Sequence, residues 1–210
     1  MKLAILGAGA WGTALAINFS ACHQVTLWTR KADHKAEIDR QRVNQRYLPG
    51  ITLPDTLQLT CELDAAIEAA DLALITIPIA GLRQLLEKLY KLNKSLPIIL
   101  CCKGFESPST QLPHQVVQEV YTNEGSYAIL SGPSFAKEVA QQRPTALTLA
   151  SKDNTFLKTI SSKIRTPYLR IYASNDVIGV ETGGATKNVI AIAAGISDGL
   201  ELGSNARAAL

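Results

Sequence analysis

The sequence contains few aromatic side chains and no long uninterrupted apolar run. Aromatic residues make up only 6% of its 210 residues. No segment approaches the ~20 apolar residues that a membrane-spanning helix needs, so no membrane span is expected. Charged residues make up 19% and hydrophobic residues 47%, which is typical of a folded globular protein and argues against long disordered tails.

Concentrated charge and paired cysteines are also scarce. The net charge is only +3, and the basic residues are scattered among acidic ones, which argues against a nucleic-acid-binding surface. The four cysteines form no CxxC pair, so we expect no metal site and no disulfide framework, but reduced, buried thiols in a cytoplasmic protein. Cys101 and Cys102 are adjacent and should point to opposite sides of a strand.

The amino-terminal segment LAILGAGAWGTALA has the length of a secretory signal but not its character. Glycines at positions 7, 9 and 12 interrupt the apolar stretch that a signal peptide requires. We therefore interpret this segment as part of the folded protein.

Short apolar runs separated by amphipathic segments predict an α/β fold. The expected strands are Leu3–Leu6, Val25–Trp28, Leu72–Ile77, Ile98–Cys102, Ala128–Leu130, Ala146–Ala150 and Leu169–Tyr172. Helical patterns lie between them, as in Leu82–Leu92 and Leu112–Tyr121. Strands without polar alternation indicate a Rossmann-like, doubly wound, mostly parallel sheet covered on both faces by helices. We assign residues 1–175 to this domain.

From about Asp176 the strand pattern stops, which predicts that residues 176–210 begin a helical substrate and dimerisation domain. KNVIAIAAGISDGL indicates a helix that is apolar nearly all round and therefore buried, with Lys187 at its start. The helical pattern NARAAL reaches the last residue without a Gly, Asn or Pro to end it, so we expect this domain to be incomplete.

Gly7, Gly9 and Gly12 form a GxGxxG motif between the first strand and the helix Trp11–Phe19. In this context Gly7 permits a tight turn, Gly9 lets the backbone approach a diphosphate, and Gly12 permits close packing of helix and strand. The motif predicts a dinucleotide site at the amino end of the helix. A glycine-rich turn without a ligand is the alternative.

The second strand ends in Trp28-Thr29-Arg30-Lys31, where NAD-specific domains usually place an acidic residue. Arg30 can pair with a 2′-phosphate, whereas a carboxylate would repel it. We therefore expect NADPH to be favoured over NADH. The alternative is that Arg30 and Lys31 form a solvated strand end.

Two further segments place polar groups at the carboxyl edge of the sheet, where open α/β sheets bind ligands. CCKGFE puts Lys103 at the end of a strand, and SGPSFAKEV puts Gly132 and Pro133 at the opening of a helix. The backbone N–H groups of residues 134–136 would then face the cleft.

Lys187 leads the apolar helix, with Ala191 and Gly195 on the same face leaving room for a substrate. A buried lysine is costly unless it is paired or functional, and a nearby cation would lower its pKa toward proton transfer. The alternative is a lysine that reaches solvent from the first turn.

The segments GAGAWGTALA, CCKGFE, SGPSFAKEV and GGATKNVIAIAAGISDG together resemble NAD(P)-dependent glycerol-3-phosphate dehydrogenases of the bacterial biosynthetic type. The resemblance includes order and spacing and runs to SDGLELGSNARAAL. It implies that the cofactor is lined by Ala10, Trp11, Arg30, Lys103 and Ala136. It implies that the substrate contacts Lys103, Gly132, Ser134 and Lys187.

The resemblance further implies a cytoplasmic, usually dimeric enzyme that reduces dihydroxyacetone phosphate to glycerol 3-phosphate for phospholipid synthesis. Lys187 would be the catalytic acid/base, with Lys103 as the second catalytic lysine. Ala21-Cys22-His23 departs from the family's glycine-containing turn. The family's phosphate-binding residues lie beyond position 210, so we expect the chain alone to be inactive or impaired. Two other readings stay open: a cofactor-binding module without turnover, and a related ketopantoate or 3-hydroxyacid reductase.

Overall fold

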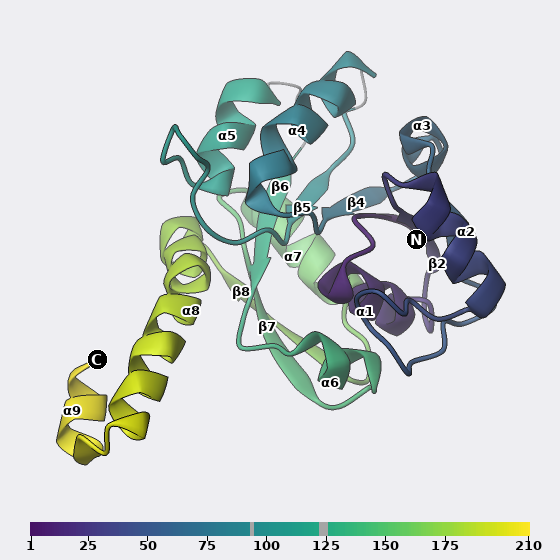
Figure 1. Cartoon of the computed structure of the whole chain (residues 1–210). Helices are drawn as coiled ribbons and strands as arrows, with labels where there is room; N and C mark the ends of the chain where they lie inside the picture. Colours follow the sequence, from purple (N-terminus) through teal and green to yellow (C-terminus); the bar gives the residue numbers. More distant parts are fainter. Residues whose placement is uncertain (93–94, 122–125) are drawn as a thin grey trace.

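The computed structural model of the chain describes residues 1–92, 95–121 and 126–210. At its centre lies one eight-stranded sheet with the strand order β3-β2-β1-β4-β5-β6-β7-β8 (Figure 1). The strands are β1 (Lys2–Leu6), β2 (Gln24–Trp28), β3 (Gln58–Thr60), β4 (Leu72–Ile75), β5 (Ile98–Leu100), β6 (Tyr127–Ser131), β7 (Thr145–Ala150) and β8 (Leu169–Ser174).

Strand direction divides the sheet into two parts. The strands β1 to β6 pair in parallel, so their carboxyl ends share one edge. β7 pairs antiparallel with β6, and β8 runs parallel to β7, so these two strands end at the opposite edge. The strand order reverses between β1 and β4, which lie side by side although β2 and β3 intervene in the chain. Ligand sites of open α/β sheets form at such a switch point.

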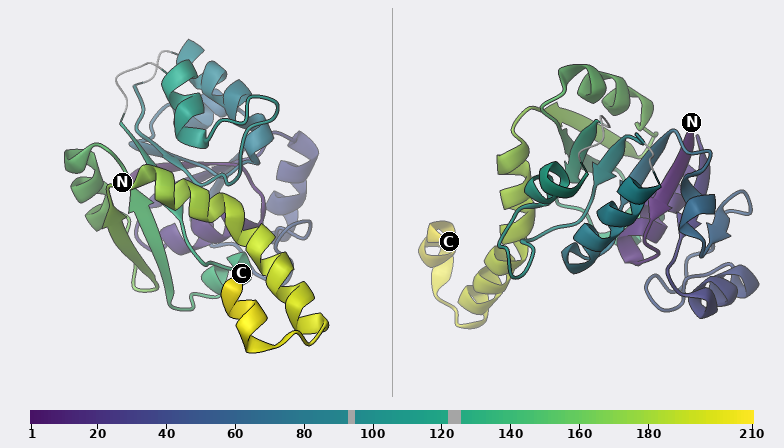
Figure 2. Two further views of the ribbon diagram at one scale, coloured as in Figure 1. Left: turned by 90° about the vertical axis from the view of Figure 1, so that its left-hand side faces the viewer. Right: turned by 90° about the horizontal axis from the view of Figure 1, so that it is seen from above.

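Helices cover both faces of the sheet, as Figures 1 and 2 show. One core cluster packs the sheet against α1, α2, α6 and α7, and the other packs it against α3, α4, α5 and the start of α8. Their bounds are α1 (Ala10–Phe19), α2 (Ala32–Gln41), α3 (Leu63–Ile67), α4 (Leu82–Lys91), α5 (Pro113–Val120), α6 (Ala136–Ala140), α7 (Asn154–Lys163), α8 (Val177–Gly199) and α9 (Gly203–Ala209), with a short 3-10 helix at Ile79–Gly81.

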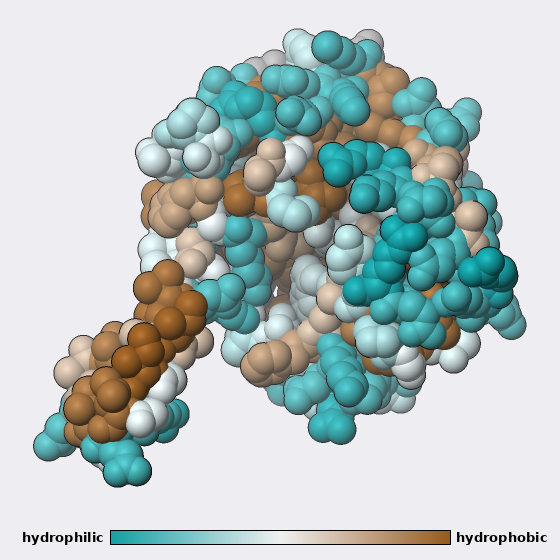
Figure 3. Space-filling model, in the orientation of Figure 1, coloured by the Kyte–Doolittle hydropathy of each residue, from teal (hydrophilic) through white to brown (hydrophobic). Residues whose placement is uncertain are grey.

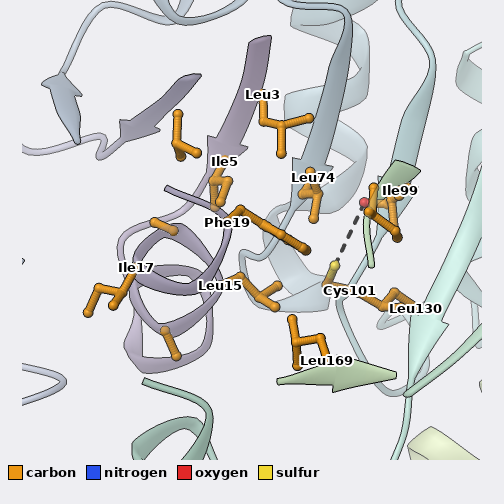
Figure 4. Packing of buried hydrophobic residues seen from close by; sticks show 14 of the residues in the cluster. Leu3, Ile5, Leu15, Ile17, Phe19, Leu74, Ile99, Cys101, Leu130 and Leu169 are labelled. Atoms are coloured by element: carbon orange, nitrogen blue, oxygen red, sulfur yellow. Dashed lines mark hydrogen bonds between the residues drawn. The ribbon is translucent and has the colours of Figure 1, made fainter. Parts of the chain in front are cut away.

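The core beside α1 is a continuous aliphatic layer in which Leu15 and Phe19 of the helix meet Leu74 and Leu130 of the sheet (Figure 4). Cys101 belongs to this cluster, whereas the adjacent Cys102 belongs to the cluster on the other face. All four cysteines are free thiols in this structure. Cys101 and Cys102 are buried as expected, whereas Cys22 is exposed and Cys61 is half-buried, so the expectation of burial was wrong for these two. The doubly wound, mostly parallel fold is therefore confirmed, and the seven predicted strands are all present.

Three details of the prediction were wrong. β3 was missed because it has only three residues, Gln58–Thr60, and two of them are polar, so no apolar run marks it. The strand expected over Leu72–Ile77 corresponds to β4, which ends at Ile75. The strand expected over Ile98–Cys102 corresponds to β5, which ends at Leu100.

The long helix α8 also differs from the expectation. It begins at Val177, so Lys187 lies in its interior and not at its start. Its second half projects from the sheet (Figures 1 and 2) and carries an exposed apolar stripe (Figure 3), which includes Val189, Ile190, Ile192 and Ile196 at 49–67% exposure. The nearly all-apolar pattern predicts burial, but these four side chains are exposed. The short helix α9 packs against α8 and leaves the stripe uncovered.

Across the described ranges, none of the helices combines the length and apolar character required to cross a lipid bilayer.

The layer beside α1 yields a stability prediction. Phe19 is fully buried against the sheet, so Phe19→Ala should lower the free energy of unfolding by about 3–5 kcal/mol through lost burial and the cavity left behind. Tyr90→Ala is the control, because Tyr90 is 44% exposed and should cost much less. Urea titration followed by circular dichroism measures both, and equal losses would contradict the packing described.

Candidate functional site

The glycine loop between β1 and α1 is held in a tight conformation. Gly7 has φ of +129°, a backbone conformation that disfavours other residues, and its N–H donates to the Trp28 carbonyl at 3.0 Å. At position 12 an added Cβ would lie 1.9 Å from the Gly7 carbonyl oxygen. Only glycine therefore allows α1 to start this close to the end of β1. Gly9 instead faces open space, where an added Cβ would meet no atom within 4 Å.

Thr76 fixes the loop to the neighbouring strand end. Its hydroxyl lies 2.9 Å from the Gly7 carbonyl oxygen and 3.2 Å from that of Leu6, and can donate to either. Thr76 follows directly after β4, on the other side of the switch point. Sequence reasoning absorbed it into an apolar strand, although a polar residue at a strand end was a usable signal.

A cavity of about 490 Å³ opens beside this loop. Gly7 and Gly9 line it on one side, and Arg30, Lys31 and Lys88 line it on others. Arg30 and Lys31 are exposed just past the end of β2, and Lys88 lies on α4. Three cations around a glycine loop and a helix amino terminus suit a ligand that carries several negative charges.

A buried polar chain lies beneath this cavity and connects its two sides. The Asn44 amide donates to the Ala8 carbonyl at 2.9 Å and to the Thr13 hydroxyl at 2.8 Å. Its oxygen then accepts from His34 Nε2–H at 3.0 Å, and the Thr29 hydroxyl oxygen lies 3.1 Å from His34 Nδ1, within hydrogen-bond distance. The network therefore ties the glycine loop to the residue before Arg30.

No sequence motif indicated this network, because His34 and Asn44 lie outside the strands and outside the glycine motif. Both side chains are almost completely buried, at 3% and 0% exposure. Their role became visible only when the fold brought residues from three separate segments together.

We predict that Asn44→Ala lowers the free energy of unfolding by about 1–3 kcal/mol, since it leaves the Ala8 carbonyl and the His34 ring N–H buried without a partner. The exposed neighbour Gln45→Ala is the matched control and should be nearly neutral. Chemical unfolding measures the difference. If the two variants are equally stable, the network contributes no stability.

The two lysines expected from the sequence do meet at the carboxyl edge of the sheet. Lys103 follows β5, and its Nζ lies 3.4 Å from the Gly132 carbonyl oxygen as a weak donor. Lys187 comes from α8, and its Nζ lies 5.9 Å from the centre of the Phe135 ring. Burial lowers the pKa of Lys103, and the nearby positive charge of Lys187 lowers it further.

The geometry of α8 explains how Lys187 reaches this edge from the middle of a helix. Because β8 runs antiparallel to β6, α8 starts below the carboxyl edge and passes along the sheet toward it. At Gly184 the helix lies so close to β6 that an added Cβ would be 2.7 Å from Ser131 Oγ. Lys187 follows one turn later and therefore lies beside Lys103.

The SGPSFAKEV segment differs from the expectation in detail. α6 begins at Ala136, three residues after Pro133, and the Ser134 N–H donates to the Gly132 carbonyl at 3.0 Å, so it is not free to face the cleft. Gly132 has φ of +155° and marks the sharp turn after β6. Phe135 is 71% exposed and contacts Lys187, a contact that the sequence did not reveal.

The remaining predicted residues lie at the starts of two helices that contact each other. Ala10 and Trp11 open α1, and Ala136 opens α6; the two helices pack together. Trp11 and Ala136 both border the core cluster on this face. The predicted residues thus gather along one edge in two groups, one around the glycine loop and one around the lysines.

The parallel sheet, the glycine loop at its switch point and the cavity beside that loop define a Rossmann-like α/β domain of the dinucleotide-binding class. Family models refine this. The model described as NAD-dependent glycerol-3-phosphate dehydrogenase N-terminus matches residues 2–157, and the corresponding C-terminus model matches residues 176–210. The chain belongs to the NAD-dependent glycerol-3-phosphate dehydrogenase family.

Curated relatives and solved structures agree with this family. The chain is 60% identical over 210 residues to the glycerol-3-phosphate dehydrogenases (NAD(P)+) of Nitrosomonas eutropha and Nitrosomonas europaea. The match covers all of this chain and 64% of each relative, so the chain spans somewhat less than two thirds of their length. The crystal structure of the Coxiella burnetii glycerol-3-phosphate dehydrogenase superposes with a TM-score of 0.88 at 42% identity, over 99% of this chain and 64% of that one.

Proposed function

We propose that this chain forms the cofactor-binding part of an enzyme that reduces dihydroxyacetone phosphate to glycerol 3-phosphate with NADPH or NADH. The observation that carries the proposal is the meeting of Lys103 and Lys187 at the same sheet edge as the glycine loop. The substrate follows from the names of relatives that are 60% identical. The dinucleotide follows from the family and from the cationic cavity.

The residues around the loop are suited to a dinucleotide. The open space at Gly9 would admit a diphosphate to the free N–H groups at the start of α1, where Ala10 and Trp11 lie. Arg30, at the end of β2, would pair with the 2′-phosphate of NADPH, so we favour NADPH over NADH. Gly7 and Gly12 would shape the loop, and Lys103 and Ala136 would border the other end of the cofactor.

The lysine pair is suited to a carbonyl that becomes an alkoxide. A bound nicotinamide supplies or accepts the hydride. In reduction Lys187 donates a proton to the developing alkoxide, and in oxidation it accepts that proton. Lys103 stabilises the same negative charge with an ammonium group in a partly buried site. Gly132 and Ser134, on the turn after β6, would contact the substrate from the other side.

We extend the proposal to the whole protein. Residues 1–175 would form the nucleotide domain, and residues 176–210 would begin the helical substrate and dimerisation domain. Large exposed apolar patches mark surfaces that another part of a protein covers. The exposed apolar stripe of α8 would therefore be buried in the whole protein, either by the rest of the helical domain or in a homodimer. A role in phospholipid synthesis in the cytoplasm would follow from the family.

Cofactor preference provides a direct test. Arg30→Asp should shift the ratio of NADPH to NADH affinity by about 10- to 100-fold toward NADH, because it removes a charge-assisted hydrogen bond and adds a repulsive charge. Arg40→Asp on α2 makes the same charge change at an exposed position that does not line the cavity. Titration of cofactor fluorescence with the purified chain measures both, and an unchanged ratio would remove Arg30 from the cofactor site.

Proton transfer provides a second test. Lys187→Ala should leave the NADPH affinity of this chain nearly unchanged. In a whole-length relative that carries a lysine at the corresponding position, alanine there should lower kcat by about 100- to 10,000-fold. Lys103→Ala should weaken cofactor binding as well. Lys158→Ala, at an exposed lysine of α7, is the control. If the relative turned over at a near-normal rate without the lysine that corresponds to Lys187, the proton transfer would be assigned to another group. If the unmodified relative bound NADPH but did not turn over dihydroxyacetone phosphate, a cofactor-binding module would be favoured.

A further inference from the structure

A buried carboxylate connects α8 to the helix α5. Glu181 of α8 is only 4% exposed. Its Oε1 accepts from the His114 backbone N–H at 2.9 Å, and its Oε2 is hydrogen-bonded to Nδ1 of the His114 ring. Burial raises the pKa of Glu181, while the bonds from His114 act in the opposite direction. His114 lies in the first turn of α5, where unpaired backbone N–H groups attract negative charge.

One end of this connection leads to Lys103. His114 is joined to Lys103 by the loop of residues 104–112, and that loop is anchored on α4. The Arg83 guanidinium donates to both oxygens of Glu106 at 2.9 and 2.8 Å, and the Ser109 hydroxyl donates to the same carboxylate at 2.6 Å. The loop, the start of α5 and Lys103 are therefore held as one unit.

The other end leads to Lys187. Lys187 follows Glu181 six positions later in the same continuous helix, and between them Gly184 lies against Ser131 of β6. A helix transmits orientation along its axis, so an anchor at Glu181 sets the direction in which the following turns leave the sheet. The second half of α8 has no anchor of this kind among the described residues, because its apolar side chains face outward.

We infer that Glu181 is a positioning residue, which clamps α8 to the first turn of α5 and thereby keeps Lys187 beside Lys103. Two ammonium groups repel each other, and tilting of the helix that carries one of them would move it away from the other. The clamp at Glu181 opposes that movement from the side of α8 that faces α5. The inference depends on the proposed function only for its catalytic consequence.

The amine reactivity of Lys103 reports its distance from Lys187 without any need for turnover. The free-amine fraction of Lys103 is measured on the 210-residue chain by acetylation with acetic anhydride from about pH 7 to 10, with peptide mass spectrometry to quantify that single site. A rise of one unit in the Lys103 pKa lowers its reactivity about tenfold at pH values below the pKa. Lys187→Ala provides the reference for complete loss of the neighbouring charge.

We expect Glu181→Ala to slow Lys103 acetylation to nearly the rate in Lys187→Ala. Glu181→Asp should slow it in the same direction, because the shorter carboxylate cannot reach both His114 donors. Asp keeps the charge and helix, so it decides the test should the alanine variant not fold. Glu87→Ala, at an exposed glutamate of α4, should behave as the native chain.

Native acetylation of Lys103 in both folded variants, judged by circular dichroism, would overturn the inference. Unfolding of the whole chain by Glu181→Asp would also overturn it, since Glu181 would then support the fold in general and not the position of α8.

Turnover provides the second readout. In a whole-length relative that carries a glutamate at the corresponding position, aspartate there should lower kcat on the order of 10- to 100-fold, because small misplacement of a catalytic group carries a cost of that size. Cofactor affinity should stay unchanged, since Glu181 lies away from the glycine loop and its cavity. Loss of cofactor affinity equal to the loss in kcat would contradict a role limited to the lysines. If the relative's native form does not turn over dihydroxyacetone phosphate, the proposed function fails while the acetylation result stands.

Discussion

The contact between Gly12 and the Gly7 carbonyl is the constraint on which the site geometry depends. An added side-chain carbon at position 12 would overlap that oxygen at 1.9 Å. Since this space is free, the first turn of α1 lies directly at the end of β1, and its backbone N–H groups face the switch point of the sheet. The Thr76 hydroxyl and the chain from Asn44 to Thr29 then hold the loop from opposite sides.

The second half of the site is organised around an unfavourable interaction. Lys103 and Lys187 come from different elements, and their like charges favour separation. The surroundings oppose that tendency in three ways: the Gly132 carbonyl accepts from Lys103, the Phe135 ring lies near Lys187, and Gly184 lets the helix approach β6. Burial lowers the pKa of Lys103, and the enforced proximity of Lys187 lowers it further. The same proximity concentrates positive charge where a substrate alkoxide would develop in the proposed reaction.

The sequence located the structural elements whose residues only one conformation or environment explains. Glycines 7 and 12 have no conformational substitute, so their motif located the loop, and β-type apolar runs located seven of the eight strands of the described sheet. It was uninformative where function depends on distant partners. His34, Asn44 and Glu181 carry no local signature, because each is defined by what it meets 10 to 67 residues away. The error at Lys187 arose because an apolar pattern does not reveal where a helix begins when its first turns contain polar residues and glycines.

The 23-residue helix α8 belongs to two environments, since its first turns are built into the sheet and its second half is exposed. A helix of this length extends about 35 Å, with Lys187 close to its midpoint. The helix is held to the rest of the domain near Glu181 and Gly184. A force on the distal apolar stripe would therefore tilt the helix and move Lys187, so whatever covers that stripe also influences how closely Lys187 approaches Lys103. The chemistry at the sheet edge and the assembly of the distal half are thus carried by a single rigid element.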